Sequence, residues 1–185
     1  MKRYIIQSIR LTVALTALLC VLYPVIVAFI GRFSNGAGNG QPIMVNGKVV
    51  GYAAIGQKFN KPQYFWGRPS AVDYNAAGSA GSNKGATNAD YLKQVKDRVD
   101  TLLKYHPYIK KADIPSDMVT ASGSGLDPDI SAQGAAIQIQ RVAQVRGLTV
   151  ASVTKLVQDH TEKPVFGPAK VNVLKLNVAL NELKK

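Results

Sequence analysis

The sequence predicts an α+β protein: a single N-terminal transmembrane helix followed by one compact extracytoplasmic α+β domain. Residues 11–30 carry no charge, and residues 41–185 mix short β-type runs with the apolar spacing of helices. The length of 185 residues fits one domain with an appendage. Because 46% of the residues are hydrophobic and only 18% are charged, the composition argues against a wholly disordered chain.

The basic residues concentrate near the N-terminus. The formal net charge is +12, but residues 1–72 hold eight basic residues and no acidic one, whereas residues 73–185 hold all 11 acids. A nucleic-acid-binding protein more often carries its basic face on the folded core, so we expect no nucleic-acid partner. One cysteine, two histidines and two glutamates leave little material for a disulfide or a metal site, and we expect no bound metal.

The apolar stretch 11–30 is long enough to cross a bilayer, since twenty residues at about 1.5 Å each give a helix of about 30 Å. Pro24 is expected to kink it. A cleaved signal peptide is the alternative, but its apolar region is usually only about 7–15 residues. Lys2, Arg3 and Arg10 precede the stretch. We therefore expect residues 1–10 in the cytoplasm and the main domain outside.

Residues 31–40 are expected to form a linker, because residues 34–40 contain only Ser, Asn, Gly and Ala. The domain then covers residues 41–185 and opens with a hairpin, in which Asn46-Gly47 supplies a two-residue turn. Residues 57–88 are rich in Gly, Asn, Ser and aromatics without a sustained period. We expect an ordered irregular segment that wraps the core or docks on a partner.

Thr87–Asp90 has the pattern of a capping box, and the following apolar stripe predicts a helix that ends at His106-Pro107. Residues 117–121 predict a short strand, and Asp127-Pro128 is expected to open a second helix ending at Gly147. Its predicted buried side consists of Ala132, Ala135, Ala136, Ile139, Val142 and Ala143.

Two elements complete the predicted domain. Thr149 is expected to cap a third helix that finishes near His160. Residues 171–174 predict a strand that a short helix follows.

The run Ser122–Gly125 is the best candidate for a ligand site. A glycine-rich turn that leads into a helix N-terminus suits an anion, but Asp127 and Asp129 already supply negative charge there, which favours a capping turn. Ser122 or Ser124 as a nucleophile would need a base, and only His106 and His160 are available.

Other candidate sites are weaker still. Residues 78–85 lack the spacing of a phosphate-binding P-loop, and the aspartates at 73, 127 and 129 lack the remaining spacing of a calcium loop. Arg68, among aromatic residues, is expected to form an ion pair or a stacking contact. From the residues alone we expect no active site.

Several motifs nevertheless resemble one known family. They are, in chain order, residues 62–71 (PQYFWGRPSA), 74–76, 81–83, 119–131 (VTASGSGLDPDIS), 141–143, 146–148, 160–162 and 171–174. Together they resemble the C subunit of the Kdp-type potassium-transporting ATPase. Lys84 and Ala86-Thr87 depart from the family pattern. These departures bear on local contacts of the loop and not on the resemblance as a whole.

The resemblance implies a non-catalytic subunit of a potassium pump in the bacterial inner membrane, without a cofactor of its own. The implied partners are a channel-like potassium-translocating subunit and a P-type ATPase subunit. The implied role is assembly, together with a chaperone effect that raises the ATP affinity of the hydrolysing subunit. An anchored binding module or a serine-dependent hydrolase that acts without a pump is the alternative.

The resemblance also implies roles for particular residues. It points to nucleotide contact through Ser122, Gly123, Ser124, Gly125 and Gln133. ATP is then possible through the complex, although the charge bias puts these residues outside, where ATP is absent. It points to structural or partner-binding roles for Trp66, Arg68, Asn83, Asp127 and Asp129.

Overall fold

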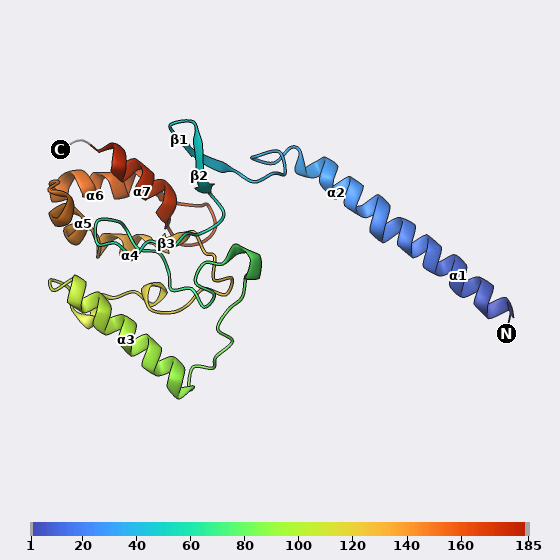
Figure 1. Cartoon of the computed structure of the whole chain (residues 1–185), viewed down its shortest axis with the longest axis horizontal. Helices are drawn as coiled ribbons and strands as arrows, with labels where there is room; N and C mark the ends of the chain where they lie inside the picture. Colours follow the sequence, from blue (N-terminus) through green and yellow to red (C-terminus); the bar gives the residue numbers. More distant parts are fainter. Residues whose placement is uncertain (1, 184–185) are drawn as a thin grey trace. The chain divides into compact units, whose positions relative to one another are not determined.

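The computed structural model describes residues 2–183 and divides them into two units, one up to Pro42 and one from Ile43 onward (Figure 1). The first unit is helical, and the second combines two small sheets with helices. The predicted α+β class with one N-terminal apolar helix is therefore confirmed.

The first unit is one continuous helical stretch. It comprises α1 (Lys2–Thr16), a π-helical turn η1 (Ala17–Leu22) and α2 (Tyr23–Gly31). Residues Arg3–Gly31 are long and apolar enough to cross a membrane. Pro24 explains the π turn, because proline has no N–H and its ring displaces the carbonyl four residues earlier, at Cys20. A succession of turns follows, with positive φ at Gly36, Gly38 and Gly40.

The predicted hairpin is confirmed at the start of the second unit. Strands β1 (Pro42–Val45) and β2 (Lys48–Tyr52) pair with each other, and Asn46 and Gly47 have φ values of 51° and 76°. Both central residues of the turn therefore adopt the left-handed conformation that a type I′ turn requires.

A three-stranded antiparallel sheet lies in the main core. Its order is β3 (Asp129–Ser131), β5 (Lys170–Asn172), β4 (Thr161–Glu162), so β5 is central. Helices α4 (Ala132–Ala136) and α7 (Val173–Glu182) pack on it, and α6 (Val150–Asp159) packs on both of these helices and on α5 (Ile139–Arg146). Fully buried apolar side chains at its centre are Phe65, Val142, Val153, Val171, Leu176 and Leu180.

The longest helix of this unit is α3 (Ala89–Tyr105), and irregular segments of the chain lie between it and the group formed by α5, α6 and α7 (Figure 1). Val99 and Leu102 join it to the same core. Its start differs slightly from the prediction, because the side chain of Asn88, not Thr87, accepts the N–H of Tyr91. Short 3₁₀ turns η2 (Ala76–Gly78), η3 (Lys111–Asp113) and η4 (Ser116–Met118) complete the elements.

The strand predicted at residues 117–121 is wrong. Residues Ser116–Met118 form η4 instead, and the N–H groups of Met118 and Val119 bond locally to Pro115 and Ser116. The carboxylate of Asp117 is meanwhile engaged by the N–H and hydroxyl of Ser131, at 2.7 and 3.0 Å. These contacts bend the chain into a turn, which the β-type side chains of the run do not reveal.

The helix predicted to start at Asp127-Pro128 begins later. Residues Asp129–Ser131 form β3, and the hydroxyl of Ser131 caps α4 by accepting the N–H of Gly134. Ala136 is exposed rather than buried, because α4 ends there and α5 starts afresh at Ile139. The predicted end at Gly147 is confirmed by its φ of 65°.

Near the C-terminus the helix caps explain what was and was not predicted. Thr149 caps α6 as expected, by accepting the N–H of Ser152. The strand predicted over residues 171–174 stops at Asn172, because its side chain accepts the N–H of Lys175 and starts α7.

Candidate functional site

The irregular segment Pro62–Trp66 is held in the core by amide side chains from two helices. Asn177 on α7 accepts the N–H of Phe65 at 2.8 Å and donates to its carbonyl at 2.9 Å. Gln138, just before α5, does the same for Trp66, at 2.7 and 3.1 Å. Each side-chain amide thus makes the two backbone hydrogen bonds that a neighbouring strand would make, so the N–H and carbonyl groups of Phe65 and Trp66 have partners although the segment belongs to no sheet.

Arg141 on α5 completes this arrangement. Its side chain is 3% exposed, and its guanidinium donates to the carbonyls of Pro62 and Tyr64 and, at 2.7 Å, to Gln138. The guanidinium carbon lies 4.2 Å from the ring centre of Trp66. Carbonyl dipoles and an aromatic face, rather than a carboxylate, therefore surround this buried charge.

His106 is the remaining member of the buried cluster. Its Nδ1 lies 2.8 Å from the carbonyl oxygen of Leu102, and its Nε2 accepts from Nε of Arg141 at 2.9 Å. Burial lowers the pKa of His106 to about 4, with the nearby guanidinium contributing, and burial lowers the pKa of Arg141 to about 10. His106 is therefore neutral near pH 7, and both its ring nitrogens are engaged.

The run Ser122–Gly125 forms a tight turn that uses its own polar groups. The hydroxyl of Ser122 accepts the N–H of Gly125 at 2.9 Å, and that of Ser124 accepts the N–H of Leu126 at 3.0 Å. The carbonyl of Gly125 accepts the hydroxyl of Ser70 at 2.7 Å.

Gly125 is required at this turn. It has a φ of +68°, and a Cβ there would lie 2.5 Å from Cγ2 of Val72. Gly123 is free of such limits. Because β3 follows the turn, the helix N-terminus on which the anion hypothesis depended does not adjoin it.

The other residues considered for nucleotide contact or catalysis lie apart from this turn. Gln133 is exposed on α4, and its side chain donates to the carbonyl of Asp113 at 3.0 Å. His160 directs Nδ1 toward the carbonyl of Leu156, at 2.9 Å. Among residues 2–183, neither serine of the turn forms a hydrogen bond with a histidine, so the geometry gives no support to a serine hydrolase.

The aspartates just before and at the start of β3, Asp127 and Asp129, pair with basic residues. Asp127 accepts from Arg68 at 2.9 Å, and Asp129 accepts from Lys170 at 2.7 Å. Tyr74 covers the first pair by donating its hydroxyl to the carbonyl of Arg68 at 2.6 Å, and burial, with Asp127 adding to it, raises the pKa of Tyr74 to about 12. These contacts fasten residues 68–74 to the strand.

Asn83 lies in the same part of the fold. Asn83 is exposed and has a φ of 52°. Two residues earlier, Gly81 packs on Gly123, since a Cβ added at Gly81 would lie 3.0 Å from the carbonyl oxygen of Gly123. Gly81 therefore lies against the Ser122–Gly125 turn, whereas Asn83 itself is exposed.

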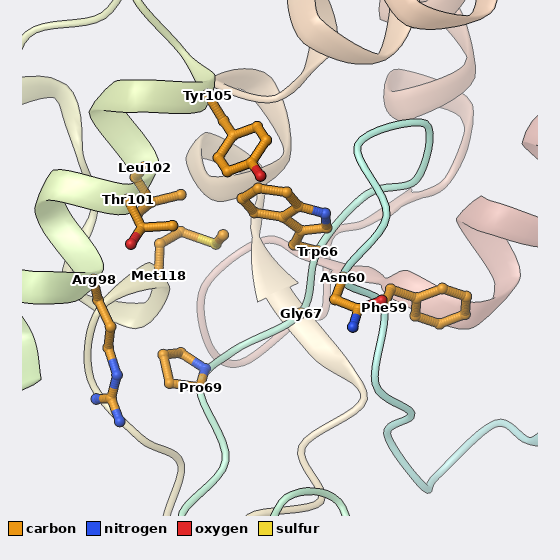
Figure 2. Close-up of a pocket in the computed structure, with 10 residues that line it drawn as sticks. All are labelled: Phe59, Asn60, Trp66, Gly67, Pro69, Arg98, Thr101, Leu102, Tyr105 and Met118. Atoms are coloured by element: carbon orange, nitrogen blue, oxygen red, sulfur yellow. The ribbon is translucent and has the colours of Figure 1, made fainter.

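An apolar groove of about 370 Å³ runs between α3 and residues 59–69 (Figure 2). Figure 2 shows Tyr105 and Leu102 of α3 next to Trp66, whose ring meets that of Tyr105 edge-on at 5.1 Å. Arg98 at the groove is held by the carbonyl of Val119. Two hydroxyls line the groove, those of Thr101 and Tyr105, but its lining contains neither a histidine nor a carboxylate that could act on them as a base. The lining residues are Phe59, Asn60, Trp66, Gly67, Pro69, Arg98, Thr101, Leu102, Tyr105 and Met118.

The residues that sequence reasoning missed are the polar members of the core. Gln138, Arg141 and Asn177 each interrupt an otherwise apolar helix face, and that interruption is the signal that could have identified them. Their partners could not have been identified, because they lie in a segment without periodicity.

Comparison with known proteins agrees with the resemblance in the motifs. The family described as "KdpC: K+-transporting ATPase, c chain" matches residues 5–182. A potassium-transporting ATPase KdpC subunit from Flavobacterium johnsoniae is 61% identical over 176 residues, covering 95% of this chain and 96% of the relative. The corresponding subunit from Bacteroides fragilis is 48% identical over 186 residues, covering 97% of each chain. The chain therefore belongs to the KdpC family, the c chain of the K+-transporting ATPase.

Proposed function

We propose that this chain is a non-catalytic accessory subunit of an ATP-driven potassium pump, needed for assembly and stability of the complex. Its membrane helix packs against the channel-like potassium-translocating subunit, and its folded domain docks on the assembled pump beside the P-type ATPase subunit. The uncovered apolar helix Arg3–Gly31 carries the proposal, because its most apolar 18-residue window has no buried residue. Family membership supports the same reading.

The proposed topology follows from the flanking charges. Lys2, Arg3 and Arg10 lie before the apolar stretch and only Arg32 follows it closely, so the N-terminus stays in the cytoplasm and the domain faces outward from the bacterial inner membrane. Changing Cys20, the only cysteine, to serine and the exposed Ala86 to cysteine provides one reporter thiol. A membrane-impermeant maleimide should label it in intact spheroplasts. Labelling only after lysis would reverse the topology.

An effect on ATP affinity, if the pump shows one, is then indirect. The hydroxyls of Ser122 and Ser124 and the side chain of Gln133 are used inside the domain, which argues against direct contact with nucleotide. Contacts that differ between two conformations of the pump can change its ATP affinity without such contact.

Two variants of the assembled pump test the proposal. Removing residues 34–185 should abolish co-purification of the subunits or potassium-dependent ATPase activity, and full activity without them would contradict the proposal. Gln133→Ala should leave the ATP concentration for half-maximal activity unchanged, because Gln133 is exposed and its loss leaves the core intact. A marked rise in that concentration would instead support direct contact between Gln133 and the nucleotide.

A further inference from the structure

The loop between β4 and β5 projects two bare apolar side chains. Val165 and Phe166 are each 92% exposed, more than any other large hydrophobic residue among the described residues 2–183. Lys163 and Pro164 precede them, and Gly167 and Pro168 follow. We call residues 163–168 the apolar tip. The other exposed large hydrophobic residues described in the second unit reach at most 53% exposure, so the pair at 165 and 166 stands apart as an adjacent apolar surface for a contact outside the chain.

The tip connects the edge strand β4 to the central strand β5 of the three-stranded sheet. Antiparallel pairing joins Thr161 to Val171 and Glu162 to Lys170, and Val171 is fully buried at the centre of the sheet. Two prolines restrict the loop, and Gly167 turns it with a φ of +108°. The two apolar side chains are therefore held away from the core by the hairpin.

Charged residues surround the base of the tip. Lys170 bonds to Asp129 at 2.7 Å and lies 3.9 Å from Glu162, and Lys175 lies 3.5 Å from the same glutamate. Lys163, the first residue of the tip, is exposed. The apolar end of the hairpin is thus followed by a zone of positive and negative side chains in which lysines outnumber carboxylates. A bilayer surface has the matching order, with acyl chains beneath phosphates and amines.

We propose that the apolar tip inserts into the lipid interface, with Val165 and Phe166 at the acyl boundary and Lys163 among the phosphates. Two side chains are too small an area for a protein interface, which usually needs about 800 Å² on each partner. They suffice for a domain whose own helix already tethers it to a bilayer, because the tether supplies a high effective concentration. The inference depends on the membrane helix and not on the pump partners.

A fluorescent reporter on the full-length chain tests this in vesicles of phosphatidylethanolamine and phosphatidylglycerol. In a Cys20→Ser background, Val165→Cys carries an environment-sensitive probe, and Val150→Cys, a valine 53% exposed on α6, is the matched control. Lipids with spin labels in the acyl chain should quench the probe at 165 several-fold more strongly than at 150. Adding Phe166→Ser and Lys163→Gln should weaken that quenching, while Trp66 emission stays unchanged and shows that the domain remains folded.

Equal quenching at both positions would overturn the proposal. So would a probe at 165 that escapes lipid quenching yet becomes shielded when the purified pump subunits are added, because that result would assign the tip to a protein pocket. Either result would leave the proposed accessory function standing.

Discussion

Replacing Asn177 by leucine should remove the support of the irregular segment at its most buried point. Asn177 is 2% exposed and makes two hydrogen bonds to the backbone of Phe65, at 2.8 and 2.9 Å. Leucine has a similar size, so the side-chain volume is largely kept while one buried N–H and one buried carbonyl lose their partners. Each such group costs about 2 kcal/mol, and the gain from a more apolar side chain returns about 1 kcal/mol. The free energy of unfolding should therefore fall by about 3 kcal/mol.

Urea unfolding of the full-length chain in detergent measures this, followed by the fluorescence of Trp66, the only tryptophan, which directly follows Phe65. Asn181→Leu on the same helix is the matched control. Asn181 is exposed and accepts one hydrogen bond from Arg146, so its loss should cost less than about 1 kcal/mol. Equal destabilisation by the two changes would refute the argument that Asn177 replaces a missing strand.

Three further outcomes follow from the structure. Burial lowers the pKa of His106 from its ordinary 6.5 to about 4, so between these pH values the unfolded chain binds more protons than the folded chain. The free energy of unfolding should therefore fall by about 3 kcal/mol as the pH drops from 6.5 to 4. His106→Gln should flatten this pH dependence, which urea titrations at successive pH values measure. Gly125→Ala should destabilise by about 2 kcal/mol in the same assay, because φ is +68° and a Cβ would clash, whereas Gly123→Ala should be nearly neutral. Arg68→Met should cost about 1–2 kcal/mol in thermal unfolding by leaving the half-buried Asp127 without its cation, and Asp127→Asn in the Arg68→Met chain should recover part of that loss.

Local chemistry made the hairpin and most helices predictable. Asn46-Gly47 adopts the two left-handed conformations that only such residues accept readily, and Gly147 ends α5 for a similar reason. In each case the decisive interaction lies within a few residues along the chain. Thr149 caps its helix through Ser152, three residues away.

Interactions between distant residues limited the rest. Trp66 bonds to a side chain 72 residues later, and Phe65 to one 112 residues later, so an irregular stretch is fixed by partners that its own composition does not show. The failed strand at 117–121 has the same origin, because Asp117 is captured by Ser131, 14 residues further on. The helix predicted to start at Asp127-Pro128 was misplaced because β5 supplies a strand partner for residues 129–131.

The motifs that carry the family resemblance turn out to occupy the points that hold the fold together. Arg141 and Arg146, from two of these motifs, donate to carbonyls of residues 62–64, which belong to a third. Ser122 and Gly125 close a turn whose hydroxyls and amides bond to one another. Diverting such a side chain to a ligand would leave the backbone group that it bonds without its partner. These motifs therefore preserve a scaffold. The contacts of the subunit with its pump partners are to be sought first on the uncovered apolar helix Arg3–Gly31, whereas the apolar tip is the proposed contact with lipid.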